Sequence, residues 1–259
     1  MLQTLKVKSR VAIKAFIQKF GYDIVHFPKL EGPYEKIHVK SFYAPWKEDS
    51  AFQNCFTQIL LHSMVDKHRC YELWDLVQQS EKVEGALLEI GVWRGGTGCL
   101  IAKKAKLCGI SEPVYLCDTF SGVVKAGMQD DIYKGGEHRD TSMGIVLDLA
   151  KSLNLDNIRV LKGIFPEETG SQIENLKFRF CHIDVDVYTS ALDIVNWVWP
   201  RLAVGGMIVF DDYGFPTTKG IRDYVNERKH FEGLISLHNL NGHAVWIKIN
   251  EAPIISSFG

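Results

Sequence analysis

The sequence predicts an α/β protein built on a doubly wound, mainly parallel sheet that ends in an antiparallel hairpin. From Val83 onward, short apolar runs alternate with segments whose apolar residues recur at helical spacing, which is the pattern of a parallel sheet covered by helices on both faces. Near the C-terminus this rhythm gives way to two short apolar runs that flank Asn241-Gly242. Asn-Gly between two such runs is a strong signal for a two-residue hairpin turn.

Five strands and two of the intervening helices are predicted in the parallel part of the chain. The strands are expected at residues 86–92, 114–120, 158–165, 178–187 and 206–211. Helical periodicity is clearest at residues 143–153 and 190–202, and the hairpin is expected to pair residues 234–240 with 243–249. Ligands of such sheets bind at the carboxyl ends of the strands, near the point where the strand order reverses. The polar residues at these strand ends are therefore the candidates for function.

The N-terminal part of the chain lacks this alternation. We expect residues 1–80 to form either a helical cap or a contact with another copy of the chain, and residues 81–259 to form the sheet domain. Within the cap, residues 1–20 carry five basic side chains and no acidic one, with apolar residues at helical spacing. The favoured interpretation is a helix that packs on protein, and the alternative is an interfacial helix on anionic lipid.

The composition excludes several classes of protein. The chain has 259 residues, of which 46% are hydrophobic and 24% charged, and its net charge is −1. This is ordinary globular composition, and a protein that works by wrapping nucleic acid would be more basic. No apolar stretch is long enough to span a membrane, and the N-terminus has no secretory signal pattern. The six cysteines form no C-x-x-C pair, which predicts a reduced, cytoplasmic protein.

A glycine-rich turn follows the first predicted strand. It reads Glu89-Ile-Gly91-Val-Trp-Arg-Gly95-Gly96, and glycines let the backbone turn sharply and approach a ligand closely. The spacing differs from the G-x-G-x-x-G of dinucleotide binders, and the acidic Glu89 suits a ligand that carries an ammonium or sulfonium charge. Asp118 ends the second strand, where a carboxylate accepts hydrogen bonds from ribose hydroxyls. Together these features favour a nucleoside ligand over a simple turn with a capping aspartate.

Four aspartates follow two strands that are expected to be neighbours. Asp184 and Asp186 end the fourth strand, and Asp211 and Asp212 end the fifth. Adjacent strands lie about 4.8 Å apart, so these carboxylates would raise one another's pKa values unless a cation neutralised them. Oxygen ligands suit Mg²⁺, Mn²⁺ or Ca²⁺. Helix capping accounts for one or two of the four acids but not for all of them.

Taken together, these motifs resemble the macrocin O-methyltransferase (TylF-type) family, which includes the deoxysugar O-methyltransferases of novobiocin type. The resemblance rests on five segments, in order, between about residues 85 and 250: E-I-G-V-W-R-G-G, D-T-F-S-G, I-D-V-D-V-Y, F-D-D-Y-G and A-V-W-I-K. It implies a class I S-adenosylmethionine (SAM) methyltransferase fold with a seven-stranded sheet. It also implies methyl transfer from SAM to a hydroxyl of a sugar or glycosylated natural product, with Mg²⁺ or another divalent cation as cofactor.

The resemblance also implies roles for individual residues. The metal ligands of the family match Asp184, Asp211 and Asp212. The general base matches Asp186. The cofactor pocket matches Glu89, Gly91 and Asp118. The chain departs from the family pattern at His182-Ile183 and in the loop at residues 121–141, both near the place where the acceptor is expected, so the identity of the acceptor stays open. The family also implies a homo-oligomer.

Two further loops hold candidate site residues. The loop after the third strand contains Gly163 and Phe165, and we expect it to line the adenine of the cofactor, with Phe165 either stacked on the base or packed in the core. The long loop after Asp118 contains Tyr133 and His138. These two residues are either lid or acceptor contacts or ordinary residues of a solvated loop.

Three alternative functions stay open at this point. A catechol-type O-methyltransferase has a similar metal site but places a catalytic lysine where this chain has Val187. A haloacid-dehalogenase-type phosphatase shares the D-x-D signature but places it on an early strand and expects threonine or valine where this chain has Tyr188. A non-catalytic SAM-binding protein is the third alternative, and the four clustered acids argue against it because unpaired carboxylates in a cleft are costly.

Overall fold

The structure, a computed structural model, describes residues 16–17, 19–20, 30–37 and 40–253. The chain divides into two compact units, Met1–Ser41 and Phe42–Gly259. The predicted basic helix at residues 1–20 lies largely outside the described residues. The second unit contains the whole predicted sheet and all of the candidate site residues.

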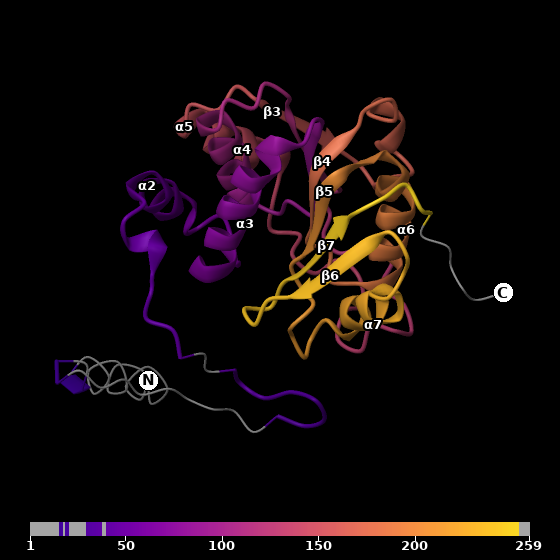
Figure 1. Cartoon of the computed structure of the whole chain (residues 1–259), viewed down its shortest axis with the longest axis horizontal. Helices are drawn as coiled ribbons and strands as arrows, with labels where there is room; N and C mark the ends of the chain where they lie inside the picture. The colour runs from indigo at the N-terminus through magenta and orange to yellow at the C-terminus, as the bar shows by residue number, and fades with distance from the viewer. Residues whose placement is uncertain (1–15, 18, 21–29, 38–39, 254–259) are drawn as a thin grey trace. The chain divides into compact units, whose positions relative to one another are not determined.

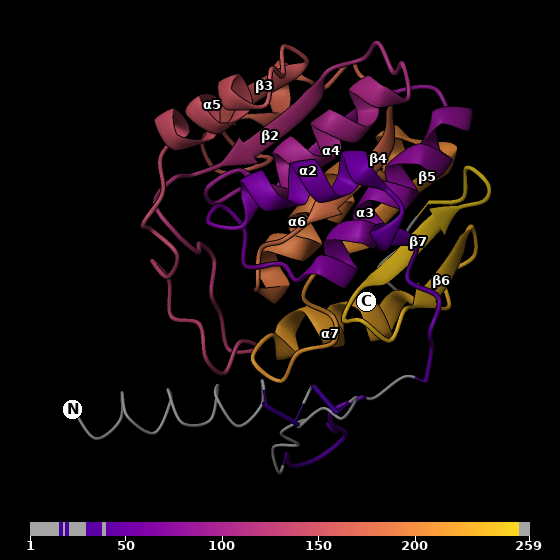
Figure 2. The same cartoon turned by 90° about the vertical axis from the view of Figure 1, so that its left-hand side faces the viewer.

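Seven strands form a single sheet in the second unit (Figures 1 and 2). They are β1 (Ala86–Ile90), β2 (Val114–Asp118), β3 (Ile158–Lys162), β4 (Phe178–Ile183), β5 (Leu202–Phe210), β6 (Leu234–His238) and β7 (Ala244–Lys248). Their order across the sheet is β3-β2-β1-β4-β5-β7-β6. The first five strands pair in parallel, and the β6–β7 hairpin adds two antiparallel strands. The predicted fold class, with its C-terminal hairpin, is confirmed.

Helices cover both faces of this sheet (Figure 2). The α-helices are α2 (Ser50–Ile59), α3 (Lys67–Gln79), α4 (Gly96–Leu107), α5 (Met143–Ser152), α6 (Tyr188–Val198) and α7 (Lys219–Arg228). Short 3-10 helices are η1 (Pro45–Lys47), η2 (Ser80–Lys82), η3 (Gly170–Gln172) and η4 (Trp199–Arg201). Side chains of α2, α3, α4 and α5 build the core on one face, and those of α6 and α7 build the core on the other.

Alternate residues of the central strands enter the two cores. In β1, Leu87 packs into the core under α4 and Leu88 into the core under α6. In β5, Val209 and Ile208 divide in the same way, because successive side chains of a strand point to opposite faces. A parallel strand buried on both faces therefore reads as a continuous apolar run, which is why these strands were recognisable in the sequence.

Residues 42–80 belong to the same compact unit as the sheet. Phe52 of α2 and Trp74 of α3 are buried in the core that α4 also lines. Asp49 begins α2 by accepting a hydrogen bond from the amide of Phe52 at 2.8 Å, and it also accepts one from the Trp74 indole at 2.9 Å. The structure thus divides the chain after Ser41, whereas the sequence suggested a boundary at residue 80, because the apolar faces of α2 and α3 are buried on the sheet domain.

Most strands are shorter than predicted by one to three residues, and the largest differences are at the end of β4 and the start of β5. β4 ends at Ile183 instead of residue 187, and the chain then turns through Asp186, whose φ is +65°. β5 begins at Leu202 instead of residue 206. Among the described residues, no helix combines the length and the apolar character that crossing a bilayer requires. All six cysteines are free thiols.

Candidate active site

The candidate site lies at the carboxyl ends of β1 and β4, where the strand order reverses. Gly91 follows β1 with φ +84°, and a Cβ at this position would lie 1.7 Å from the carbonyl oxygen of Asp184. Only glycine allows the two strand tips to approach so closely. The amide of Asp184 donates to the carbonyl of Ile90 at 2.9 Å, which fixes where the first aspartate of the cluster lies.

The first pocket, hereafter the donor pocket, opens beside this glycine turn. Its lining residues are Met64, Ile90, Gly91, Trp93, Cys117, Asp118, Thr119, Gly122, Val123, Val124, His138, Gly163, Phe165, Asp184, Val185, Asp186, Ser190 and Ile194. An apolar slot with a few polar groups is typical of a small-molecule site, and its chemistry fits a nucleoside. Four of the residues predicted for the cofactor, Gly91, Asp118, Gly163 and Phe165, line it.

Asp118 holds the glycine turn in shape as well as lining the donor pocket. Its Oδ2 accepts hydrogen bonds from the amides of Val92 at 2.7 Å and Trp93 at 2.9 Å. Its Oδ1 accepts one from the amide of Phe120 at 2.6 Å. Asp118 therefore caps the turn, which was one of the two roles considered for it. The residue also lines the donor pocket.

Glu89 does not reach the donor pocket, contrary to the prediction. Its side chain is fully buried, and its Oε1 lies 2.9 Å from Nδ1 of His182 on the neighbouring strand. A Cβ on Gly98 of α4 would lie 2.4 Å from Glu89 Oε2, so the carboxylate points under the first turn of that helix. Because β1 alternates, Glu89 shares the face of Leu87, and that face is turned into the core.

Phe165 is packed in the core and also contributes to the wall of the donor pocket. It is 5% exposed, and its ring meets that of Trp197 edge-on with centroids 4.9 Å apart. It also lines the donor pocket together with Gly163. The ring is therefore part of the core and at the same time part of the pocket wall, where one side of it is available to a flat ligand.

The second pocket, hereafter the acceptor pocket, lies against the first. Its lining residues are His62, Ser63, Met64, Val65, Arg69, Val92, Trp93, Thr97, Tyr133, His138, Asp184, Asp186, Asp211, Asp212 and Phe215. Both pockets share Met64, Trp93, His138, Asp184 and Asp186, which we call the shared wall. Molecules bound in the two pockets would meet at this wall.

Three of the shared-wall residues have a backbone that is rare for side chains with a Cβ. Trp93, His138 and Asp186 have φ values of +46°, +61° and +65°. Left-handed backbone in residues other than glycine costs about 1–3 kcal/mol each and clusters at functional sites. The strain supports a functional role for this wall.

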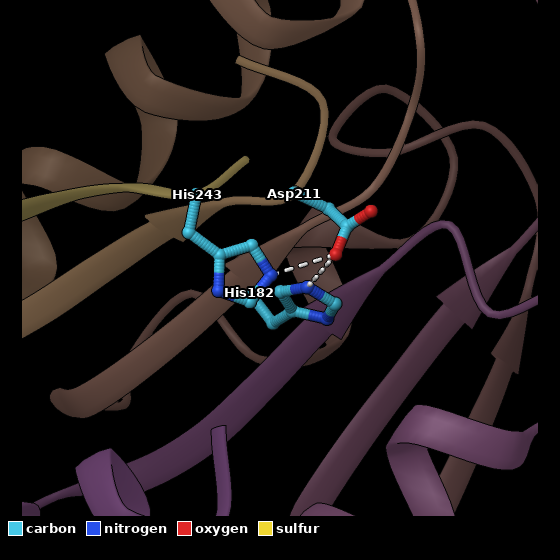
Figure 3. Close-up of side chains that lie close together, drawn as sticks. All are labelled: His182, Asp211 and His243. Carbon is cyan, nitrogen blue, oxygen red and sulfur yellow. Dashed lines mark hydrogen bonds and ion pairs between the residues drawn. The ribbon is translucent and has the colours of Figure 1, made fainter. Parts of the chain in front are cut away.

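Three carboxylates gather at the floor of the acceptor pocket. One oxygen from each of Asp184, Asp211 and Asp212 lies within 4.8 Å of the others, as the adjacency of β4 and β5 predicted. Asp211 is the one bound by basic groups: His243 Nε2 lies 2.8 Å from its Oδ1, and Arg69 donates to its Oδ2. Figure 3 shows His243 and His182 converging on this carboxylate, with His182 Nε2 at 3.6 Å.

The ionisation of these carboxylates differs. Burial raises the pKa of Asp184 well above its usual range, and the neighbouring Asp211 adds to the effect. Burial also raises the pKa of Asp212, together with the charges of Asp186 and Asp184. Burial would raise the pKa of Asp211 too, but the nearby His182, the hydrogen bond from His243 and the charge of Arg69 lower it well below its usual range.

This donor set fits a divalent cation. In the described part of the chain, the ion pairs at this edge of the sheet go to Asp211 and Asp186, and none goes to Asp184 or Asp212. A carboxylate has about four lone-pair sites, so Asp211 keeps acceptor capacity beyond its bonds to Arg69 and His243. Oxygen ligands and uncompensated negative charge are what Mg²⁺, Mn²⁺ or Ca²⁺ would satisfy.

Asp186 stands apart from these three and faces the loop that follows β2. Its amide donates to Asp212 Oδ2 at 3.1 Å. Its carboxylate faces Tyr133, and its Oδ2 lies 4.0 Å from His138 Nε2. Burial raises the pKa of Asp186, while Tyr133 and the charge of His138 oppose the shift. Both loop residues that the sequence singled out thus lie beside the predicted base.

The loop at residues 119–142 is fastened to the glycine turn. Asp140 accepts hydrogen bonds from the Trp93 indole and from the Arg94 guanidinium, both at 2.9 Å. Thr141 donates to the carbonyl oxygen of Trp93. These bonds hold the loop where Tyr133 and His138 line the acceptor pocket.

Sequence reasoning missed several residues of the acceptor pocket and its surroundings. Met64 and Arg69 belong to the segment that was assigned to a cap, and so does Glu72, which lies on α3 with Arg69 and contacts His243. Trp93 was noted only as part of a motif, and His243 only as a neighbour of the hairpin turn. Arg69 is 142 positions from its partner Asp211, and no local pattern signals such a pairing.

Comparison with known proteins decides the family. Residues 47–248 match the macrocin O-methyltransferase (TylF) family. The chain belongs to this family. It is therefore an O-methyltransferase that depends on SAM, as its motifs suggested, and the phosphatase alternative is wrong.

Individual O-methyltransferases are similar to more than half of this chain. Mycinamicin III 3''-O-methyltransferase of Micromonospora griseorubida is 28% identical over 189 residues, which are 67% of this chain and 72% of that protein. Demethyldecarbamoylnovobiocin O-methyltransferase of Streptomyces niveus is 28% identical over 173 residues, 62% of this chain and 63% of that protein. The structure of the O-methyltransferase NovP superposes with a TM-score of 0.61 at 24% identity, over 73% of this chain and 83% of that one. That superposition supports the fold.

The fastening of the loop in this TylF-family enzyme is open to a direct test. Replacing Asp140 with alanine removes two side-chain hydrogen bonds to the glycine turn. Because this carboxylate is exposed to solvent, the effect should be modest, and we expect KM for SAM and for the acceptor to rise about 2- to 5-fold. Steady-state kinetics measure the change. Asp131→Ala, an exposed acid of the same loop, is the control, and equal KM values in the two variants would contradict the fastening role.

Proposed function

We propose that this enzyme transfers the methyl group of SAM to a hydroxyl of a sugar, free or carried by a natural product, with a divalent cation at Asp184, Asp211 and Asp212. SAM would occupy the donor pocket and the sugar the acceptor pocket. The observation that carries the proposal is the shared wall, because it presents Asp184 and Asp186 to both pockets at once. The sugar class follows from the named activities of the relatives.

The chain's own residues supply binding, orientation and a proton acceptor. Gly91, Asp118 and the Gly163 turn form the wall of the donor pocket, with Phe165 beside them. SAM brings an electrophilic methyl group on a sulfonium sulfur. A cation held by the three aspartates would lower the pKa of a hydroxyl beside it.

Asp186 is the general base of this proposal. It lies in the wall between the pockets, and its raised pKa makes its ionised form a stronger base than an ordinary aspartate. The proton of the acceptor hydroxyl passes to its carboxylate as the hydroxyl oxygen forms its bond to the methyl carbon and the carbon–sulfur bond breaks. Tyr133 and His138 hold the carboxylate in place and exclude water on the loop side.

The composition and the thiols support two further parts of the proposal. Five of the six free cysteines are buried, which suits a reducing compartment such as the cytoplasm. The near-neutral net charge suits a small-molecule or glycan acceptor better than nucleic acid. We also propose a homo-oligomer in which the N-terminal part of the chain provides the contact between copies.

The experiment is an acceptor panel. The enzyme is incubated with SAM and Mg²⁺ and with each of three acceptors: mycinamicin III, demethyldecarbamoylnovobiocin and catechol. Release of S-adenosylhomocysteine is measured with and without chelator. We expect turnover of a sugar-bearing acceptor that stops with chelator. Turnover of catechol alone would favour the catechol-type alternative, and chelator-insensitive turnover would contradict the cation.

A further inference from the structure

The carboxylate of Glu72 on α3 binds several side chains in the turn of the C-terminal hairpin. Its carboxylate accepts hydrogen bonds from the side-chain amides of Asn239 and Asn241, the latter at 2.8 Å. It also bonds Nδ1 of His243. Burial raises and these hydrogen bonds lower the pKa of Glu72, with a net decrease. One glutamate thus fixes three side chains of the turn that joins β6 to β7.

His243 connects this glutamate to the candidate cation site. Its side chain has no exposed surface, and its Nε2 lies 2.8 Å from Asp211 Oδ1 while its Nδ1 faces Glu72. Both ring nitrogens are therefore engaged, and the ring has one orientation that satisfies them. Figure 3 shows the ring directed at the Asp211 carboxylate.

Helix α3 also contacts Asp211 directly, in addition to the link through Glu72 and His243. Arg69, one turn before Glu72, donates to Asp211 Oδ2 and is itself held by Asp66 Oδ2 at 2.8 Å. The two oxygens of Asp211 are thus set by one helix, one directly through Arg69 and the other through His243. Asp212 Oδ2 accepts only the amide of Asp186, and in the described part of the chain no basic side chain pairs with Asp184 or Asp212.

We propose that Glu72 and His243 are positioning residues that orient Asp211 for the divalent cation. The inference rests on the proposed function, since it presumes a cation at the three aspartates. Partners that orient a metal ligand are typically worth about 10- to 100-fold in metal affinity. Neither residue touches the donor pocket, so SAM affinity is independent of them.

The test measures Mn²⁺ affinity directly by calorimetry and electron paramagnetic resonance, with SAM affinity and melting temperature on the same samples. Glu72→Gln is expected to raise the Kd for Mn²⁺ about 10- to 100-fold and to leave the Kd for SAM within twofold. Glu112→Gln is the matched control, because it removes a carboxylate from an ion pair with Arg179 near the amino ends of the strands. It is expected to change neither Kd.

Two substitutions of His243 separate positioning from general loss of structure. Glutamine reaches as far as Nε2 and retains a donor for Asp211, whereas asparagine retains a partner for Glu72 but not for Asp211. His243→Asn is therefore expected to weaken Mn²⁺ more than His243→Gln, at similar melting temperatures. Equal Mn²⁺ affinities in both variants and the wild type would overturn the inference.

Two other outcomes have distinct meanings. A wild-type protein that binds SAM but not Mn²⁺ would overturn the proposed cation dependence, and the positioning role with it.

His182, Asp211 and His243 also offer atoms within 4.8 Å of one another. If Co²⁺ gave an intense visible spectrum that His243→Asn abolished, His243 would be a metal ligand, and the positioning inference would be overturned while the cation remained.

Discussion

Asp186→Asn is expected to lower kcat by about 10²- to 10⁴-fold while leaving the affinities for SAM and for the divalent cation unchanged. Asparagine keeps the size of the side chain and an acceptor for the Tyr133 hydroxyl, but it cannot take a proton. Asp186 also lies outside the group of three aspartates whose oxygens converge. The loss should therefore fall on the chemical step, and single-turnover kinetics at saturating SAM and acceptor measure it.

A matched substitution tests whether the loss of activity arises simply from replacing an aspartate with asparagine. Asp156→Asn removes an exposed carboxylate that pairs with Lys106, and we expect it to retain wild-type turnover. Calorimetric titration of each variant with SAM shows whether the donor pocket is intact. If Asp186→Asn turned over at the wild-type rate, another group would have to accept the proton, and the assignment of the base would be wrong.

Asp212→Asn is expected to remove the stabilisation that the divalent cation gives to the wild-type protein. A ligand present at a hundred times its Kd stabilises the folded state by about 2.7 kcal/mol. For a domain of about 200 residues, that corresponds to a rise in Tm of about 5–10 °C. The variant, which retains the shape of the side chain but not its charge, should gain less than about 2 °C. Thermal melts with Mg²⁺ or with chelator measure both values.

The dependence of this effect on pH follows from the raised pKa values of Asp184 and Asp212. In the folded protein without a cation, these carboxyls hold protons more tightly than in the unfolded chain. The contribution of these two carboxyls to the free energy of unfolding is therefore largest at acidic pH. It is lost as the pH rises above 3.8, the ordinary pKa of aspartate. A cation compensates the charge that then appears, so the rise in Tm should be larger at pH 8 than at pH 5. An equal rise at both pH values would contradict this origin.

The centre of the sheet could be predicted from the sequence because β1 and β4 are buried on both faces. The run from Ala86 to Ile90 is buried at every position, and Asn241-Gly242 marked the hairpin. The end of β4 was misplaced because Asp184-Val-Asp-Val187 alternates as a strand does. The backbone instead leaves the strand and turns at Asp186, which has a left-handed conformation. The alternation of polar and apolar residues gives no sign of this turn.

The candidate site was predictable only where strand order determines it. The convergence of Asp184, Asp211 and Asp212 followed from the expectation that their strands are neighbours, which the pairing of β4 with β5 confirms. Glu89 was misassigned because its place beside the glycine turn in sequence says nothing of which face its side chain takes. Arg69 and His243 reach Asp211 from other elements of the fold, and such tertiary contacts leave no mark in local sequence.

The twisted backbone of Trp93, His138 and Asp186 has a consequence for anyone who engineers this enzyme. Glycine would relieve that conformation at each of these places, so a library selected only for heat resistance should accumulate glycine there. The same changes would remove three side chains of the wall that the two pockets share. Thermal stability and catalytic activity thus favour different residues at these three positions. A selection that keeps the three positions unchanged would avoid this conflict.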